Sequence, residues 1–395
     1  MVSIFSLWKE VKRRDAVAES QRLRMLKKTI SEKITQSDNF PESLTLPEGE
    51  VQLEYTIDNQ LQNQVRALVD SYRPDYAVVV VLDNATGHVI SALGYRGSTR
   101  TVDQSLIFNS QNPAASIFKI VTAASLLEKE EIDVDTEVRV KGKGTTLYKY
   151  QLMDYDNQRW TRSISLNKAF ALSNNVAFGK LAIKKLASMN IDNSAEKFYF
   201  NRDLMSDVEI PHSNYRSPTS QYNMAEIASG FNRSTTLNPI HAAFLASVIS
   251  NGGEANFPRL LTSIRVNGND WVSDVVGKQK IIDSEVASSI KEMMIETVDT
   301  GTARKSFRQF MRKYRGRLIV GGKTGSITGG EPNGKRDWFV AFSKEKYSTD
   351  KGISLSVMLV NQKKWKVKSS FLASRIIDFY YKDLPRQEKI LTKLN

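Results

Sequence analysis

Three short polar fragments lie far apart along the chain, and together they constrain its fold more than any other feature. They are Ser116-Ile117-Phe118-Lys119, Ser173-Asn174-Asn175 and Lys323-Thr324-Gly325. Brought together, these residues supply a nucleophile, a base, a second hydroxyl that carries a proton and a cationic group that binds an anion. If the three fragments form one site, strands from the early and late parts of the chain have to share a sheet.

Apolar runs typical of strands do occur in both parts of the sequence. They cover residues 77–82, 89–93, 317–322, 338–342 and 353–360, and a helical run follows over 366–381. We predict a mixed α and β (α+β) domain with one mostly antiparallel central sheet. The helices that carry Ser116 and Ser173 are expected to pack against this sheet.

The Ser-x-x-Lys pattern is too common here to carry information by itself. It occurs seven times, beginning at Ser6, Ser116, Ser165, Ser194, Ser288, Ser343 and Ser348. Lys-Thr-Gly, in contrast, occurs once, at Lys323. The sequence around each serine therefore has to show which of the seven matches contains the nucleophile.

These surroundings favour Ser116. Residues 112–128 read as a loop closed by Pro113 and followed by a largely apolar helix, with Ser116 in its first turn and Lys119 on the same face. Burial of such a helix lowers the pKa of its lysine toward that of a usable base. A single Ser-x-x-Lys match usually has a structural explanation: the serine caps a helix and the lysine extends into water. Ser343 and Ser348 lie in a charged loop and Ser288 on an amphipathic helix, where that interpretation suffices.

Other catalytic chemistries find little support. The chain has three histidines, His88, His212 and His241, for which we expect surface or structural roles, and it has no cysteine. A Ser-His-Asp triad and a histidine-rich metal site are therefore poorly supported, and thiol chemistry and disulfides are excluded. We expect neither a metal nor another cofactor.

With these fragments and their flanks, the chain resembles the transpeptidase domain of penicillin-binding proteins, which are relatives of the serine β-lactamases. The resemblance covers roughly residues 50 to 382. Beyond the three fragments it rests on residues 51–62, 78–95, 163–172, 237–243, 251–253, 301–303 and 337–340. Two positions depart from the usual family pattern: Ala115 where many members have Gly, and Ser326 where Thr is frequent.

The resemblance implies a catalytic role for four side chains. Ser116 would attack a carbonyl carbon and Lys119 would accept its proton. Ser173 would relay a proton to the departing amine, and Lys323 would add positive charge beside Ser173.

It also implies residues that bind the substrate. Asn175 would hold a peptide bond, Thr324 would donate to a carboxylate, and Gly325 would let the substrate lie against the strand. The backbone N–H groups of Ser116 and Ser326 would form the oxyanion hole.

The activity implied is D,D-transpeptidation on the D-Ala-D-Ala end of peptidoglycan stem peptides, with β-lactam antibiotics as covalent acylating agents. The sequence leaves open a D,D-carboxypeptidase, because both reactions share one acyl-enzyme. It also leaves open a class-D-like β-lactamase, which residues 113–119 partly resemble, and a β-lactam sensor or non-catalytic penicillin-binding scaffold.

We expect two parts, a basic helical stalk and linker over 1–49 and the transpeptidase domain over 50–395. The net charge of +13 and the many basic residues of the stalk suit contact with an anionic membrane or with a cell-wall or division protein. No nucleic-acid module is present, so no nucleic-acid partner is expected. The implied chemistry places the protein outside the cytoplasm, at the outer face of the membrane or in the periplasm. Residues 2–8 are too short to span a membrane, so an export or anchor segment is expected outside this sequence.

One further segment has two interpretations. Residues 142–162 are polar and rich in tyrosine, which suits either an ordinary surface loop or a loop that rims the site.

Overall fold

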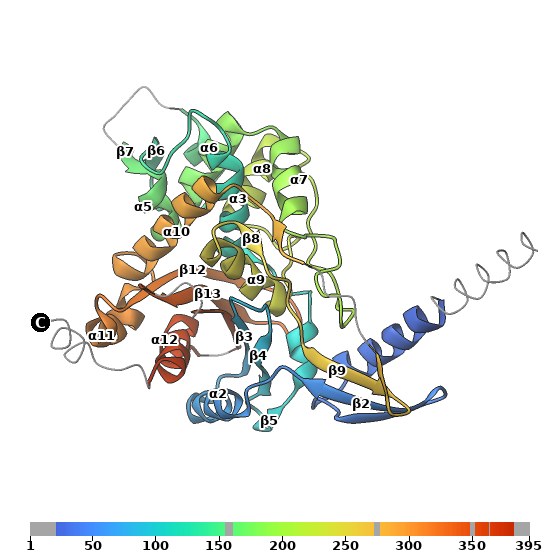
Figure 1. Ribbon diagram of the computed structural model, residues 1–395. Coiled ribbons are helices and arrows are strands. Elements are labelled where there is room, and N and C mark those ends of the chain that lie inside the picture. The colour runs from blue at the N-terminus through green and yellow to red at the C-terminus, as the bar shows by residue number, and fades with distance from the viewer. Residues whose placement is uncertain (1–20, 155–160, 272–276, 348–351, 363, 383–395) are drawn as a thin grey trace, which may run out of the picture.

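A six-stranded antiparallel sheet forms the centre of the molecule in this computed structural model, which describes residues 21–154, 161–271, 277–347, 352–362 and 364–382 (Figure 1). The strands follow the order β12 (Leu318–Thr328), β13 (Lys335–Glu345), β14 (Gly352–Asn361), β3 (Tyr76–Asp83), β4 (Val89–Arg96) and β5 (Thr101–Val102). All neighbours are antiparallel. The pairing of β14 with β3 joins the late strands to the early ones and confirms the predicted sheet.

Both faces of the sheet are buried. Successive side chains of a strand point to opposite sides, so each strand contributes to both faces. On β3, Val78, Val80 and Leu82 belong to one apolar core, whereas Ala77, Val79 and Val81 belong to the other. The strands are therefore continuously apolar, and the sheet separates two hydrophobic cores.

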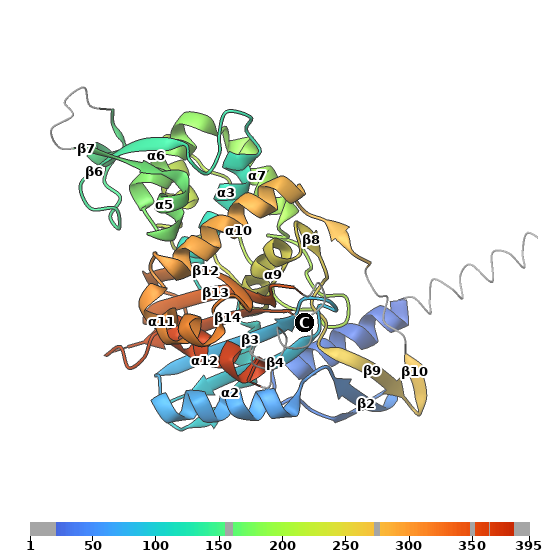
Figure 2. The same ribbon diagram turned by 60° about the vertical axis from the view of Figure 1, so that its left-hand side comes forward.

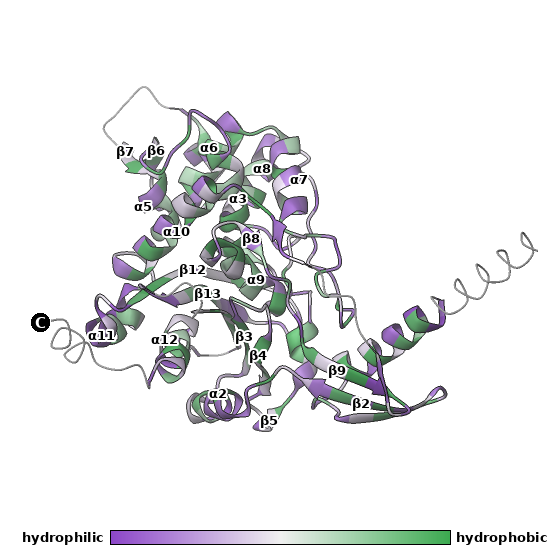
Figure 3. Ribbon diagram, viewed as in Figure 1, coloured by the Kyte–Doolittle hydropathy of each residue, from purple (hydrophilic) through white to green (hydrophobic). Residues whose placement is uncertain are grey.

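Helices cover the two faces of the sheet (Figure 2). One face packs against α2 (Asn59–Tyr72), α11 (Arg304–Tyr314) and α12 (Ser369–Tyr380). The other packs against α9 (Pro239–Ser250), which is buried along its whole length, and α10 (Ser284–Asp299). Figure 3 shows α10 with a polar side and an apolar side, as expected for a helix at the edge of a core.

A mostly helical region continues from this second face. It contains the turn η2 (Ala115–Phe118), α3 (Lys119–Leu127), α4 (Lys149–Leu152), α5 (Leu166–Ala171), α6 (Asn175–Lys185), α7 (Ser188–Lys197) and α8 (Gln221–Ser229), with a small sheet of β6 (Glu137–Lys141) and β7 (Thr161–Ser165). Helix α3 is almost wholly buried among these elements, so it holds Lys119 inside the protein. Of the helices in the described ranges, none has both the length and the apolar character needed to cross a membrane.

The N-terminal part differs from the stalk and linker predicted for it. The helix over residues 21–35 buries Leu26, Ile30 and Ile34 in the main core, so this portion is not free-standing. The expected linker is wrong for residues 43–46, which form β1 (Ser43–Leu46). This strand pairs with β2 (Gly49–Tyr55) in a sheet completed by β9 (Leu261–Val266) and β10 (Asn269–Trp271).

The physical reason is that Leu46 and the buried residues of β2 join the core, which outweighs the two flanking prolines. The basic residues before position 21 lie outside the described residues, and the division of the chain at residue 49 stays a prediction.

Candidate active site

Ser116 lies in a 3₁₀ turn that precedes the helix, not in the first α-helical turn as predicted. The turn is η2, and the α-helix begins at Lys119. The reason is the left-handed backbone of Ala115, with φ of 50°, which an α-helix does not tolerate. Gly230 lies directly against this residue: a Cβ at position 230 would come 1.9 Å from the Ala115 carbonyl oxygen. The close approach of these two backbones therefore shapes the turn that presents Ser116.

Lys119 has no solvent exposure and is surrounded by oxygen acceptors. Its Nζ lies 2.9 Å from Ser116 Oγ and 2.8 Å from Asn175 Oδ1, and it also donates to the backbone carbonyl of Ser229. Burial lowers the pKa of Lys119 well below its usual value, and the nearby positive charge of Lys323 lowers it further. This shift favours the neutral form of the amine.

The hydrogen bonds of Lys119 suit a base. A neutral amine has two N–H donors and one lone pair. Asn175 Oδ1 and the Ser229 carbonyl can only accept, so they take both donors. In the structure Lys119 Nζ donates to Ser116 Oγ. In the neutral amine, whose two donors are taken, the lone pair faces this hydroxyl and can accept its proton.

Ser173 stands between two helices with its backbone in the left-handed region, at φ of 56°. It follows α5, and the next residue, Asn174, caps α6 by accepting from the Ala177 N–H. Lys323 Nζ donates to Ser173 Oγ at 2.9 Å. Burial alone lowers the pKa of Lys323 to about 7. Ser173 is therefore paired with a lysine that exchanges protons near neutral pH.

Strand β12 brings the third fragment to the nucleophile. Thr324 shares a hydrogen bond of 2.7 Å with the hydroxyl of Thr302. A Cβ on Gly325 would come 3.1 Å from Ile117 and 3.3 Å from Ala115. The missing side chain thus lets β12 pack closely on the turn of Ser116, a use of Gly325 that the sequence did not indicate. Its predicted contact with the substrate stays a prediction.

The Asn175 side chain is occupied within the protein. Its Oδ1 accepts from Lys119, and its Nδ2 donates to the Thr145 carbonyl at 3.1 Å. In this structure it therefore orients the base, whereas the predicted contact with a substrate peptide bond stays a prediction.

A cavity of about 530 Å³ opens over these groups. Of the predicted residues, it is lined by Ser116, Ser173, Asn175, Thr324, Gly325 and Ser326. Lys119 and Lys323 lie behind this surface, fully buried. The structure therefore assembles all eight predicted residues around one cleft, with the serines in front and the lysines behind. Ser116 and Ser326 both line this cleft, and the oxyanion hole expected from their backbone N–H groups stays a prediction.

Other residues of the cleft escaped the sequence analysis. One side is cationic, with Arg233, Lys335 and Lys368, and Trp365 lies 4.8 Å and 5.5 Å from the two lysine ammonium groups. Asp337 is the one acidic residue that lines the described cleft. This positive balance suits a substrate that ends in a carboxylate.

The sequence analysis also missed the Thr302 hydroxyl and the Ser229 carbonyl, and only the first could have been found from the sequence. Thr302 lies in the Gly301-Thr302-Ala303 fragment, which offered a signal, but the Ser229 contribution is a backbone carbonyl that no residue type indicates. Thr145 shows that the segment 142–162 contributes to the cleft wall where it is described; residues 155–160 lie outside the described residues.

The three histidines lie outside this cleft. Buried His241 contacts the Phe198 carbonyl at 2.6 Å, and burial lowers its pKa to about 4. His212 pairs with Asp203 on the surface. These positions confirm that the histidines do not serve Ser116.

Comparison with known proteins places this geometry in a family. The family model described as the penicillin binding protein transpeptidase domain matches residues 77–377. None of the curated proteins compared with the chain matches it.

Solved structures share the fold at low sequence identity. The D,D-transpeptidase domain of a peptidoglycan glycosyltransferase from Eggerthella lenta is 19% identical, with a TM-score of 0.65 over 86% of this chain and 85% of that one. Penicillin-binding protein A from M. tuberculosis, solved as a ceftriaxone acyl-enzyme complex, is 18% identical, with a TM-score of 0.64 over 85% and 80%. Penicillin-binding protein 3 from the same organism, in complex with aztreonam, is 15% identical, with a TM-score of 0.67 over 85% and 80%. The family match and the shared fold lead to one conclusion: the chain belongs to the penicillin-binding protein transpeptidase domain family.

Proposed function

We propose that this protein is a serine D,D-transpeptidase of peptidoglycan synthesis that acts on the D-Ala-D-Ala end of stem peptides through an acyl-enzyme on Ser116. The observation that carries the proposal is the contact of 2.9 Å between Ser116 Oγ and Lys119 Nζ, made inside the protein by an amine whose other partners are acceptors. A nucleophile and its base are thus held together before a substrate binds.

Acylation follows from these positions. Ser116 Oγ attacks the carbonyl carbon of the penultimate D-Ala, and its proton passes to Lys119 Nζ. The backbone N–H groups of Ser116 and Ser326 stabilise the negative oxygen of the tetrahedral intermediate. The C–N bond then breaks, and Ser173 Oγ passes a proton to the leaving D-Ala amine, with Lys323 supplying the proton to Ser173.

Deacylation reverses these steps with a new nucleophile. The amine of an acceptor stem peptide attacks the ester carbon, gives up a proton through Ser173, and forms an amide as the Ser116 oxygen leaves. Ser116 recovers its proton from Lys119. The products are a cross-linked peptide and one free D-Ala, so atoms and charges balance.

The cleft also supports recognition of the carboxylate at the end of the substrate. Thr324 presents a hydroxyl to the cleft, and Thr302 fixes its orientation. Lys323 and the cationic side of the cleft favour an anion there. β-Lactams carry a comparable carboxylate beside a reactive amide, and relatives have been solved as their acyl-enzyme complexes. We therefore propose that β-lactams acylate Ser116 of this protein.

The proposed chemistry takes place outside the cytoplasm, in the periplasm or at the outer face of the membrane. The basic N-terminal segment would there contact an anionic membrane or a cell-wall or division protein.

The decisive experiment follows the intact mass of the protein and its products over time. The protein is mixed with penicillin, and separately with a synthetic stem peptide ending in D-Ala-D-Ala, with and without an amine acceptor. A transpeptidase forms a stable penicilloyl adduct and yields the amide product when the acceptor is present.

Each other outcome identifies an alternative. Hydrolysis alone, unchanged by the acceptor, would indicate a carboxypeptidase. Rapid turnover of a chromogenic cephalosporin would indicate a β-lactamase. Labelling by penicillin without reaction on the stem peptide would indicate a sensor or scaffold.

A further inference from the structure

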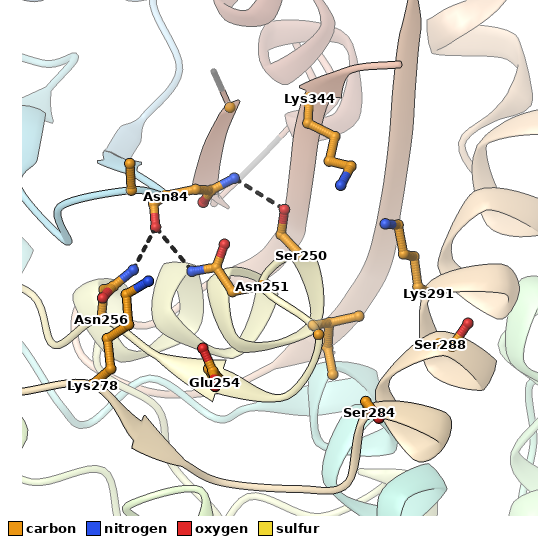
Figure 4. A pocket seen from close by; sticks show the side chains of 14 residues that line it. Asn84, Ser250, Asn251, Glu254, Asn256, Lys278, Ser284, Ser288, Lys291 and Lys344 are labelled. Carbon is orange, nitrogen blue, oxygen red and sulfur yellow. Dashed lines mark hydrogen bonds between the residues drawn. The ribbon is translucent and has the colours of Figure 1, made fainter. Parts of the chain in front are cut away.

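A second cavity, of about 420 Å³, shares no lining residue with the catalytic cleft. It lies where the β3–β4 turn, the end of α9, the first half of α10 and the facing ends of β13 and β14 meet (Figure 4). Its polar side chains are Asn84, Ser250, Asn251, Glu254, Asn256, Lys278, Ser284, Ser288, Lys291 and Lys344. We call this cavity the lysine pocket.

Three ammonium groups surround it. Lys291 comes from α10 and Lys344 from β13, and in Figure 4 their Nζ atoms point toward each other on one side of the pocket. Lys278 lies on the opposite side. Burial lowers the pKa of half-buried Lys291 to about 8, and repulsion from Lys344 adds to this effect. The protein thus holds two like charges at a distance where they repel each other.

The described residues do not neutralise this charge. In those ranges none of the three lysines forms an ion pair, whereas Lys280, close by, pairs with Asp283 at 2.5 Å. The lining includes one carboxylate, Glu254, which leaves the three lysines with a net charge of +2. Lys291 also lies 5.9 Å from the ring of Phe342, a contact too weak to replace an anion.

The opposite wall is rigid. The Asn84 carbonyl accepts from the side-chain amides of Asn251 and Asn256, at 2.9 Å and 2.8 Å. The Asn84 side chain donates to Ser250 and accepts from Ser354. Because these hydrogen bonds fix the wall in advance, a ligand loses little free energy to ordering it.

We propose that the lysine pocket binds a phosphate group carried by a small polar molecule. A phosphomonoester has a charge of about −1.5 to −2 at pH 7, which balances the lining. Lysine ammonium groups act on phosphate as point charges, and the hydroxyls of Ser284 and Ser288 can donate to its oxygens. A volume of about 420 Å³ exceeds the need of a bare phosphate and leaves room for an organic part.

Isothermal titration calorimetry on the full chain at fixed ionic strength tests this site. Inorganic phosphate and glycerol 1-phosphate are the probes, and glycerol and acetate are the controls. We expect saturable binding of both phosphates, with glycerol 1-phosphate the tighter of the two. The double substitution Lys291→Met with Lys344→Met should weaken binding at least tenfold, and Lys291→Gln alone at least threefold.

A matched control removes two charges elsewhere. Lys129→Met with Lys305→Met changes one partly buried and one exposed lysine outside the pocket and should leave phosphate affinity within twofold. Equal weakening in both double variants, or no saturable binding of either phosphate, would overturn the proposal. Penicillin acylation at Ser116 shows that each variant is folded. Because this readout is independent of phosphate binding, failure of the pocket and failure of the proposed catalytic function are distinguishable.

Discussion

Two Ser-x-x-Lys fragments on helical turns end in very different environments. Lys119 is fully buried, contacts Ser116 and has two acceptor partners. Lys291 is half-buried in the lysine pocket, has no hydrogen bond to Ser288 among the described contacts, and faces another lysine. The pKa of each lysine is lowered, but only Lys119 is positioned to take a proton from its serine. Burial and acceptor geometry, rather than the four-residue pattern, distinguish the two.

The largest predicted difference between the two fragments appears when the lysine of each is removed. Lys119→Met takes away the proposed base, and we expect the second-order rate constant of penicillin acylation to fall about 10³-fold. Lys291→Met should leave that rate constant within about twofold, since the lysine pocket shares no lining residue with the cleft. Stopped-flow measurement with a fluorescent penicillin compares them, and equal losses would refute the distinction.

Two glycines with left-handed backbones sharpen the comparison of the two regions. Gly230 and Gly252 have φ of 67° and 69°, but only a Cβ at 230 would collide, at 1.9 Å from the Ala115 carbonyl. Gly252→Ala should lower the free energy of unfolding by about 1 kcal/mol through backbone strain alone. Gly230→Ala should cost about 3 kcal/mol and slow acylation by at least tenfold, because the turn of Ser116 has to move. Chemical denaturation and acylation kinetics measure both, and matching behaviour of the variants would count against a shaping role for Gly230.

The pH dependence of acylation should report both lysines for which we propose catalytic roles. Lys119 has to be neutral to accept a proton, so the rate constant falls as the pH falls through its lowered pKa. Lys323, with a pKa of about 7, loses its positive charge as the pH rises, so attraction of the substrate carboxylate weakens above that value. We expect an alkaline decrease of about tenfold for benzylpenicillin.

Penicillin methyl ester is the matched control because it has no carboxylate. Its rate constant should keep the acid decrease and show a smaller alkaline decrease, because Lys323 still supplies a proton to Ser173 but has no carboxylate to attract. An alkaline decrease of the same size with the ester would show that Lys323 does not act on the carboxylate.

The smallest effect concerns the threonine pair at the cleft. Thr302→Val removes the hydroxyl that contacts Thr324 at 2.7 Å. A neutral hydrogen bond contributes about 0.5 to 1.5 kcal/mol, so acylation should slow about three- to tenfold. The loss should be confined to substrates with a carboxylate, and an equal loss with the methyl ester would indicate a general structural disturbance.

The central sheet was predictable because continuous apolar runs reveal strands buried on both faces, and the need to join Ser116 with Thr324 gave the link between β3 and β14. The gathering of the eight predicted residues at one cleft was predictable because their side chains suit a single chemistry, whereas their roles stay predictions. The left-handed turn at Ala115 was not, since its close contact with the backbone of Gly230 joins residues far apart in the sequence. Strand β1 was also missed, because a four-residue strand between two prolines has no periodic signal and depends on pairing with β2.

The most direct test of the account locates the penicillin adduct. The wild-type protein, Ser116→Ala and Ser288→Ala are each incubated with benzylpenicillin, and the modified peptide is identified by mass spectrometry after proteolysis. We predict one adduct, on the peptide that contains Ser116, in the wild type and in Ser288→Ala, and none in Ser116→Ala. An adduct that persists in Ser116→Ala, or one that maps to another serine in the wild type, would contradict the central claim that the buried Lys119 makes Ser116 the nucleophile.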